Sequence, residues 1–234
     1  MDMTTLEDLK KQAAETAVEL IESGMVVGLG TGSTAVYAVR ALGKLLGNGR
    51  LSHIIAIPTS EATAALAREC AIPLTTLTDH PIIDLTIDGA DEIAPNLDLT
   101  KGLGGALLRE KIVAAASKRN IIIADHTKLV EKLGSRAPIP VEVVGFAERP
   151  LTLFLESLGA RVVRRTIKGG IGSFITDENN IILDCYFDNG ITDPYALSDQ
   201  LNLRPGVVEH GLFLDIAVEA FLAGPEGVEH RQKG

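Results

Sequence analysis

Short, mainly apolar runs alternate with amphipathic segments through the first half of the chain, and this alternation restricts the fold more than any other feature. The runs cover residues 25–29, 54–57, 82–87 and 120–124. Strands with apolar side chains on both faces are typical of a parallel sheet that helices cover on each side. Apolar residues at three- and four-residue spacing predict helices over 5–23, 33–46 and 103–118, and a further helix that Ser60 caps and that runs to Cys70.

The order of elements changes near Gly134. We expect strands at 139–144, 161–166, 173–176 and 181–187, helices at 148–158 and 194–201, and a hairpin turn at 177–180. This order is typical of a small α+β sandwich. The segment 212–222 is expected to be a helix that returns to the first domain. The sequence therefore predicts an α/β protein, with a parallel-sheet domain over 1–133 and 208–234 and an inserted α+β lid domain over 134–207.

The formal net charge of −9 argues against a nucleic-acid partner, because such proteins normally present a basic surface. The first residues lack a basic segment followed by an apolar run, and no apolar stretch approaches the roughly 18 residues that a membrane span needs. The two cysteines, Cys70 and Cys185, lie outside any CxxC or metal-binding spacing. We therefore expect reduced thiols in a cytoplasmic protein that does not bind a membrane.

A glycine-rich loop joins the first apolar run to the following helix, with the sequence Gly-Leu-Gly-Thr-Gly-Ser-Thr over 28–34. Glycines let a ligand approach the backbone, a helix N-terminus favours an anion, and Thr31, Ser33 and Thr34 add hydroxyl donors. Three interpretations are open: a tight turn without a ligand, a dinucleotide loop of the G-x-G-x-x-A type, and a simple phosphate or hydroxyl site. We favour the last, because the next strand ends in Pro-Thr-Ser rather than in the acid that would hold a ribose.

Two aspartates follow a buried strand, in the sequence Asp-Gly-Ala-Asp-Glu over 88–92. Ligands of open α/β sheets bind outside the carboxyl ends of the strands, so Asp88 and Asp91 are candidates for substrate binding. One alternative is an Asp-Gly turn with solvated acids. Another is a Mg²⁺ site made by Asp88, Asp91 and Glu92, which is disfavoured because no nearby histidine or further acid completes the ligand set.

A carboxylate stands where the core is expected, in the segment 101–111, whose three glycines lie just before or at the start of the predicted helix. Desolvation of Glu110 there would raise the pKa of its carboxyl towards neutrality, which suits a general base. The alternative is a partly buried ion pair with Arg109 or with a distant arginine. The residues that share its stripe of the helix are all apolar: Leu103, Ala106, Leu107, Val113 and Ala114.

A last short motif, Asp-His-Thr-Lys over 125–128, follows the fourth apolar run directly. Lys128 is a cation at a strand end and is suited to a phosphate. His126 is expected to be a solvated loop histidine.

These four motifs, in this order and spacing, resemble those of type A ribose-5-phosphate isomerases, and the likeness extends over nearly the whole chain. Two further segments support it, 138–143 and 205–213. The resemblance implies interconversion of ribose 5-phosphate and ribulose 5-phosphate without metal or cofactor. It also implies a Rossmann-like domain with a ferredoxin-like insertion, and a homodimer or a dimer of dimers.

The resemblance also implies roles for individual residues. Glu110 would move the proton between C1 and C2. Asp88 would act on the sugar oxygens, including ring opening, with support from Asp91, and Lys101 would stabilise the ene-diolate. Leu103 stands where many members have glycine, and His126-Thr127 replace the common Ser-Ser. The implied substrate-lining residues are Thr31, Gly32, Ser33, Thr34, Asp88, Gly89, Ala90, Asp91, Lys101, Gly102, Leu103 and Gly104, with Lys128 and also Lys10 towards the phosphate.

Three other functions compete with this interpretation. A coenzyme A transferase of similar fold would use a glutamate as nucleophile, but the chain is short for that class. A sugar-phosphate sensor usually carries a helix-turn-helix, for which the roughly 24 residues before the first strand are too few. A glucosamine-phosphate deaminase needs a ring-opening histidine, which the sequence does not place.

Overall fold

The computed structural model describes residues 5–167, 169 and 172–233. These residues form two compact units, and each is considered by itself. The first unit contains the chain up to Ala90, Arg109–Lys128, and the chain from Asp215 onwards. The second unit contains Asp91–Leu108 and Leu129–Leu214.

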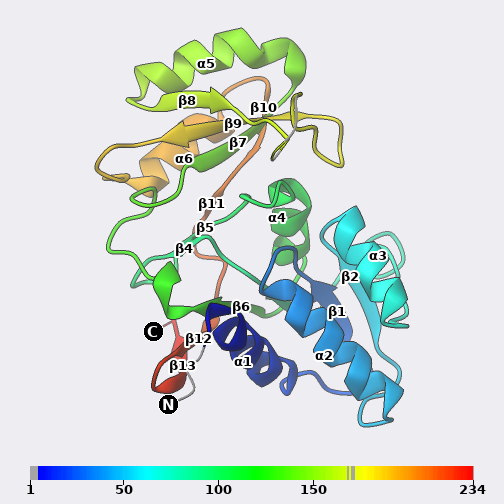
Figure 1. Ribbon diagram of the computed structural model, residues 1–234. Helices are drawn as coiled ribbons and strands as arrows, with labels where there is room; N and C mark the ends of the chain where they lie inside the picture. Colours follow the sequence, from blue (N-terminus) through cyan, green and yellow to red (C-terminus); the bar gives the residue numbers. More distant parts are fainter. Residues whose placement is uncertain (1–4, 168, 170–171, 234) are drawn as a thin grey trace. The chain divides into compact units, whose positions relative to one another are not determined.

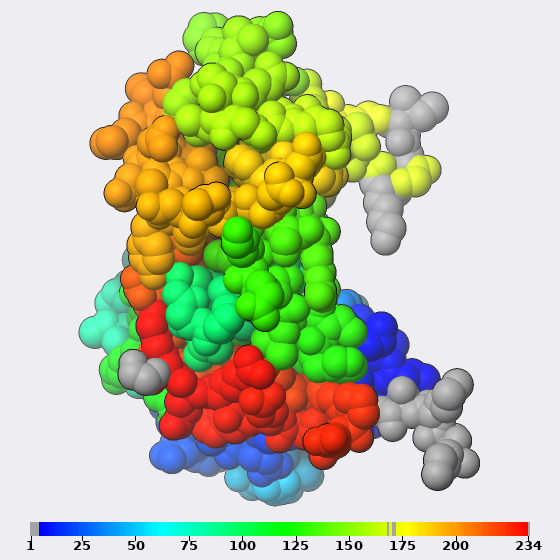
Figure 2. Space-filling model, turned by 90° about the vertical axis from the view of Figure 1, so that its left-hand side faces the viewer, coloured from blue at the N-terminus to red at the C-terminus, as the bar shows by residue number. Residues whose placement is uncertain are grey.

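The first unit is built on a six-stranded sheet in the order β13-β12-β6-β3-β1-β2. Neighbouring strands are parallel except for the C-terminal hairpin, in which β13 pairs antiparallel with β12. Most side chains of β13 are exposed, and this hairpin lies at the surface, in red in Figure 2. The strands are β1 (Val26–Leu29), β2 (Ile55–Pro58), β3 (Leu85–Asp88), β6 (Asn120–Asp125), β12 (Glu219–Gly224) and β13 (Gly227–Gln232).

Helices cover both faces of this sheet, as its apolar strands predict (Figure 1). Val27 and Leu29 of β1 pack into the cluster that α1 and α2 share. Gly28 faces the opposite side, where Val113 of α4 lies so close that a Cβ on the glycine would be 2.9 Å from it. The alternation of side chains along a strand thus separates two apolar layers. The helices are α1 (Leu6–Val18), α2 (Ala35–Gly47), α3 (Glu61–Glu69) and α4 (Leu107–Ala115), and a 3-10 turn, η1 (His126–Lys128), follows β6.

The second unit is an α+β sandwich with a four-stranded antiparallel sheet in the order β10-β7-β9-β8. Two helices, α5 (Glu148–Ser157) and α6 (Pro194–Asn202), contribute leucines to its apolar core. The strands of this sheet are β7 (Ile139–Val143), β8 (Arg161–Arg164), β9 (Ile181–Tyr186) and β10 (Val207–His210), and η2 (Gly145–Ala147) precedes α5. A separate small sheet is made by β4 (Glu92–Ile93), β5 (Leu99–Thr100) and β11 (Leu212–Phe213).

The predicted fold class is confirmed: a Rossmann-like α/β domain carries an inserted α+β domain. Ser60 does cap α3, because its hydroxyl accepts the N–H of Thr63 at 3.0 Å. The turn at 177–180 is present, since Thr176 donates its N–H to Asn180 O. The two units differ from the predicted ranges chiefly in 91–108, which joins the second unit because β4 and β5 pair with β11 there.

Three local predictions are wrong. The segment 212–222 is not a helix, because Leu212–Phe213 pairs with β5 and Glu219–Gly224 pairs with β6. Its apolar spacing comes instead from a strand that is buried on both faces. The segment 173–176 forms a single bridge, between Ser173 and Thr166, rather than a strand. The helix predicted over 103–118 is shorter, since its glycine-rich start stays a loop up to Leu107.

In the part of the chain that the structure describes, no helix has the length and apolar character needed to cross a bilayer.

Candidate active site

The loop that follows β1 is fixed by the aspartate at the end of β3. Asp88 is 4% exposed, and its Oδ1 accepts the N–H groups of Thr31 at 3.1 Å and Gly89 at 2.7 Å. A Cβ on Gly30 would lie 2.0 Å from that oxygen, so only glycine permits this approach. The predicted motifs at 28–34 and 88–90 therefore meet at one edge of the sheet, as the carboxyl ends of neighbouring parallel strands must.

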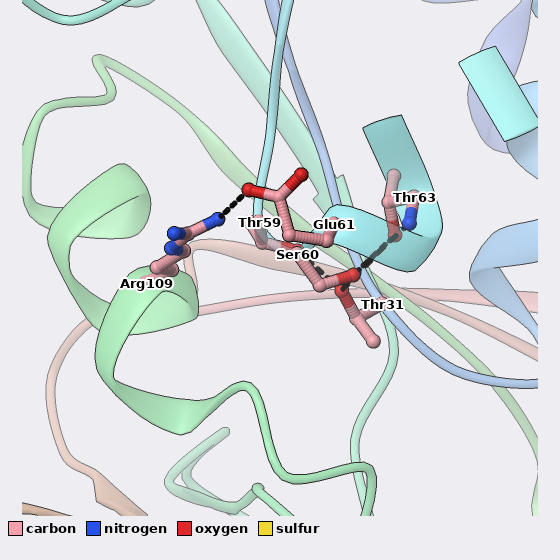
Figure 3. Close-up of polar contacts among 6 residues, drawn as sticks. All are labelled: Thr31, Thr59, Ser60, Glu61, Thr63 and Arg109. Atoms are coloured by element: carbon pink, nitrogen blue, oxygen red, sulfur yellow. Dashed lines mark hydrogen bonds and ion pairs between the residues drawn. The ribbon is translucent and has the colours of Figure 1, made fainter. Parts of the chain in front are cut away.

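The hydroxyl of Thr31 contacts a cluster of buried hydroxyls that lie between the end of β2 and the first turn of α3 (Figure 3). Its Oγ1 lies 2.7 Å from Thr59 Oγ1, 2.8 Å from Ser60 Oγ and 3.1 Å from Thr63 Oγ1. The sequence predicted Ser60 as a helix cap and placed Thr59 only at the end of the preceding strand, and it gave no role to Thr63. The available signal was a hydroxyl residue at the end of an apolar strand, followed by two more at capping spacing.

The remaining residues of the 31–34 motif lie at the start of α2. Gly32 and Ser33 are exposed, and Gly32 has a φ of +113°. Thr34 precedes the helix, and its side chain makes no capping hydrogen bond. The amides of Val36 and Tyr37 in the first turn donate to the carbonyls of Gly32 and Thr34, at 3.1 Å each, so the backbone and not the Thr34 side chain binds them.

Glu110 lies in the first turn of α4 with 4% of its surface exposed. Its predicted apolar neighbours on the helix, Ala106, Leu107, Val113 and Ala114, are all buried. Leu103 is 45% exposed and does not belong to that stripe, because the helix begins four residues later.

Arg109, the neighbour of Glu110, forms an ion pair with a glutamate of α3. Arg109 donates to Glu61 Oε1 at 2.8 Å, on the first residue of α3 (Figure 3). The guanidinium holds the pKa of the Glu61 carboxyl below its usual value. This ion pair of Arg109 lies at the surface, on the glutamate side.

The second unit carries the residues of the 101–104 motif together with Asp91. Lys101 is 3% exposed, and its Nζ lies 5.4 Å from the centroid of the Phe213 ring. Asp91 Oδ2 accepts the N–H of Leu103 at 2.9 Å, so this acid shapes the loop. Gly102 has a φ of +103°, a backbone conformation that other residues rarely adopt. Leu103 and Gly104 are exposed.

Glu92, a possible magnesium ligand in the sequence, has a structural role. It is 1% exposed and accepts hydrogen bonds from Gly134 N at 2.5 Å, Arg136 N at 2.6 Å, Ala137 N at 3.0 Å and Thr100 Oγ1 at 3.2 Å. Four donors satisfy a buried carboxylate. Within the described residues, His, Cys, Asp and Glu side chains form no group of three that could hold a metal ion.

The predicted phosphate-binding cations lie in the first unit. Lys128 ends η1, is half-buried, and makes no hydrogen bond or ion pair with the residues that the structure describes. His126 is exposed, as expected of a loop histidine. Lys10 on α1 donates to Glu7 Oε1 at 2.7 Å.

Taken separately, each unit presents a set of groups suited to a small polar ligand. The first holds a buried carboxylate on a helix, an aspartate at a strand end and a hydroxyl-rich loop before a helix N-terminus. The second holds a buried lysine beside a loop in which Gly102 has a positive φ. These are the parts of an α/β enzyme that uses acid–base chemistry on a small oxygen-rich substrate.

Comparison with known proteins identifies the family. Residues 55–227 match the family described as ribose 5-phosphate isomerase A (phosphoriboisomerase A). The chain is 53% identical to ribose-5-phosphate isomerase A of Roseiflexus castenholzii, over 94% of this chain and 93% of that one. It is 50% identical to the protein of the same name from Chloroflexus aurantiacus, over 98% and 95%.

Solved structures agree with this comparison. A D-ribose-5-phosphate isomerase in complex with phospho-erythronic acid superposes with a TM-score of 0.94 at 40% identity, covering 97% of this chain and 99% of that one. Ribose 5-phosphate isomerase A from Methanocaldococcus jannaschii gives a TM-score of 0.92 at 40% identity, covering 98% and 100%. The chain belongs to the ribose 5-phosphate isomerase A family.

Proposed function

We infer that this chain is an aldose–ketose isomerase that interconverts D-ribose 5-phosphate and D-ribulose 5-phosphate, in the non-oxidative branch of the pentose phosphate pathway. The observation that carries the inference is the burial of Glu110 among apolar side chains in a member of this family. A carboxylate with little water around it holds a proton more readily, and that property suits a base that removes a proton and returns it. The match to the relative that binds phospho-erythronic acid, a phosphorylated sugar acid, supports the substrate class.

The proposed reaction begins with opening of the sugar ring, in which Asp88 assists by binding the sugar oxygens. Glu110 then removes the proton on C2 of the open aldose. The electron pair forms the C1–C2 double bond of an ene-diolate, and the carbonyl oxygen on C1 takes the negative charge. The O2 proton then passes to O1, and Glu110 returns the first proton to C1, which leaves a carbonyl at C2 and gives the ketose. One carboxylate can serve both carbons, because the proton it removes is the one it returns.

The other residues bind the substrate and stabilise charge in this proposal. Lys101 is assigned to the ene-diolate oxygens, where one preorganised donor contributes about 3 kcal/mol to the reduction of the barrier. Asp91 supports the reaction by holding the amide of Leu103 and so the 101–104 loop. The loop 31–34, the turn 88–90 and the loop 101–104 line the substrate, and Lys128 binds its phosphate, with Lys10 as a second cation towards it.

The variant Glu110→Gln tests the base directly. It keeps the size and polarity of the side chain, so the protein should fold and bind phospho-erythronic acid as before. The kcat for ribose 5-phosphate should fall by about 10²–10⁴-fold, which is the usual contribution of a general base. Glu69→Gln, on the exposed end of α3, is the matched control and should keep full activity. Near-normal turnover by Glu110→Gln would refute the assignment. The assay is run with EDTA, because we propose a reaction that needs neither metal nor cofactor.

We also propose a cytoplasmic homodimer or dimer of dimers. Both cysteines are thiols, as in a reducing compartment, and burial raises the pKa of the Cys185 thiol. Phe146 and Leu203 are 99% and 84% exposed, and exposed apolar side chains of this size support contact with another subunit. Light scattering of the eluting protein measures the assembly, and a monomer at micromolar concentration would contradict it.

A further inference from the structure

The cluster of hydroxyls around Thr31 contains more oxygen–oxygen contacts than hydroxyl protons (Figure 3). Four hydroxyls belong to it, from Thr31, Thr59, Ser60 and Thr63, and each supplies one proton. Thr59 Oγ1 lies 3.0 Å from Leu29 O, and Thr63 Oγ1 lies 3.0 Å from Gly30 O. Carbonyl oxygens cannot donate, so the protons of Thr59 and Thr63 are committed to these two contacts.

Two protons remain for the contacts among the hydroxyls themselves. Ser60 donates to Thr63 Oγ1 at 3.0 Å, and Thr31 donates to Ser60 Oγ at 2.8 Å. Thr59, Ser60 and Thr63 are all buried, at 0%, 5% and 6% exposure, so water cannot easily replace a missing partner. The proton of Thr31 is therefore held inside the cluster and is not available to a phosphate oxygen.

The same contacts fix the backbone of the loop. The hydroxyls of Thr59 and Thr63 bind the carbonyls of Leu29 and Gly30, directly before Thr31, while Asp88 binds the N–H of Thr31. The start of the loop, from Leu29 to Thr31, is thus held by buried groups of Thr59, which follows β2, of Thr63 in α3 and of Asp88 in β3. The ion pair between Glu61 and Arg109 nearby is largely exposed on the glutamate side, so it contributes little to this fixation.

We propose that Thr59, Ser60 and Thr63 are positioning residues for the substrate loop, and that the Thr31 hydroxyl acts by anchoring the loop to them rather than by donating a hydrogen bond to the substrate phosphate. This proposal rests on the isomerase function inferred above. It gives the start of α3 a second task besides capping its own helix. The loop 31–34 is then a preorganised binding element. It loses its conformational entropy when the protein folds, so substrate binding does not have to order it.

Thr63 offers the sharpest test, because valine keeps its shape and removes the proton bound to Gly30 O. We expect Thr63→Val to raise the KM for ribose 5-phosphate by about tenfold with kcat changed less than threefold, and Thr63→Ser to restore both to within twofold. Thr16→Val is the matched control: its hydroxyl also donates to a carbonyl, Gln12 O at 2.8 Å, but on the exposed side of α1. Glu61→Gln should likewise change KM by less than twofold.

A mutant cycle separates anchoring from direct contact. If the Thr31 hydroxyl works through the cluster, Thr31→Val combined with Thr63→Val should raise KM no more than the stronger single variant does. Thermal melting checks that all variants are folded. Full additivity, or an unchanged KM for a folded Thr63→Val, would overturn the proposal. An inactive wild-type protein would instead refute the proposed isomerase function, so the two failures are distinguishable.

Discussion

Arg165 donates from Nη1 to the carbonyl oxygens of Gly102 at 2.7 Å and Leu103 at 3.2 Å. Its guanidinium also pairs with the carboxylate of Asp184 on β9, with Nε 2.9 Å from Oδ2. Both side chains are nearly buried, at 11% and 12% exposure. Because Asp91 binds the N–H of Leu103, the loop proposed to line the substrate is held by a buried cation at its carbonyls and by an acid at its amide.

We expect Arg165→Lys to lower kcat/KM by about tenfold, which corresponds to about 1.4 kcal/mol. Lysine retains the charge that Asp184 needs, but its ammonium cannot reproduce the planar fork that reaches a carboxylate and two carbonyls together. Steady-state kinetics and a denaturant melt measure the effect on activity and stability. Arg164→Lys is the matched control, because the neighbouring arginine pairs with Glu148 at the surface. If both variants behave alike, the role of Arg165 in holding the loop is refuted.

The charge of Lys128 should matter for binding rather than for turnover. We expect Lys128→Ala to raise KM for ribose 5-phosphate by about 10- to 100-fold, since a charge-assisted hydrogen bond contributes about 1.5–3 kcal/mol. The kcat should change little, because the phosphate is remote from C1 and C2. Lys132→Ala, which removes an exposed lysine, provides the control. Weakening of phospho-erythronic acid binding by the same factor would support the assignment, whereas an unchanged KM would contradict it.

The sequence predicted those features that depend on local pattern. The parallel strands, the cap at Ser60 and the burial of Glu110 each follow from residues within one turn or one strand of each other. The contacts of Arg165 do not, because 63 residues separate it from Gly102. The prediction for segment 212–222 was wrong for a related reason. Glu219–Gly224 is buried on both faces because it lies between β6 and β13, and a short apolar run does not distinguish such a strand from a buried helix.

A buried acid of the second unit should make stability depend on pH. Burial raises the pKa of Glu142, and the hydrogen bonds from Asn180 and Thr176 oppose this only in part. The folded state then binds a proton more tightly than the unfolded state does. The free energy of unfolding therefore falls as pH rises from the ordinary glutamate pKa through the raised value.

Glu142→Gln removes this titration and can keep the oxygen that Thr176 and Asn180 bind. We expect the variant to gain stability relative to the wild type as pH rises from 4 to 7, with the gain levelling off once the wild-type carboxyl is ionised. Chemical denaturation at a series of pH values measures the difference. Glu156→Gln, on the exposed side of α5, should show no such trend. A difference that is constant with pH would mean that Glu142 is not the group responsible.

The close approach of Gly30 to Asp88 gives a final prediction about how the loop and β3 fit together. A Cβ on Gly30 would lie 2.0 Å from Asp88 Oδ1 and 2.6 Å from its Cα, so either the carboxylate or the strand must move. We expect Gly30→Ala to cost about 1–3 kcal/mol of folding free energy. It should lower kcat/KM more than stability alone explains, because Asp88 is proposed to bind the sugar oxygens. Gly47→Ala is the informative comparison, since that glycine ends α2 with open space around it, and alanine there should stabilise the helix by up to about 1 kcal/mol. An active, unshifted Gly30→Ala enzyme would show that the position of the Asp88 carboxylate is not critical for the reaction.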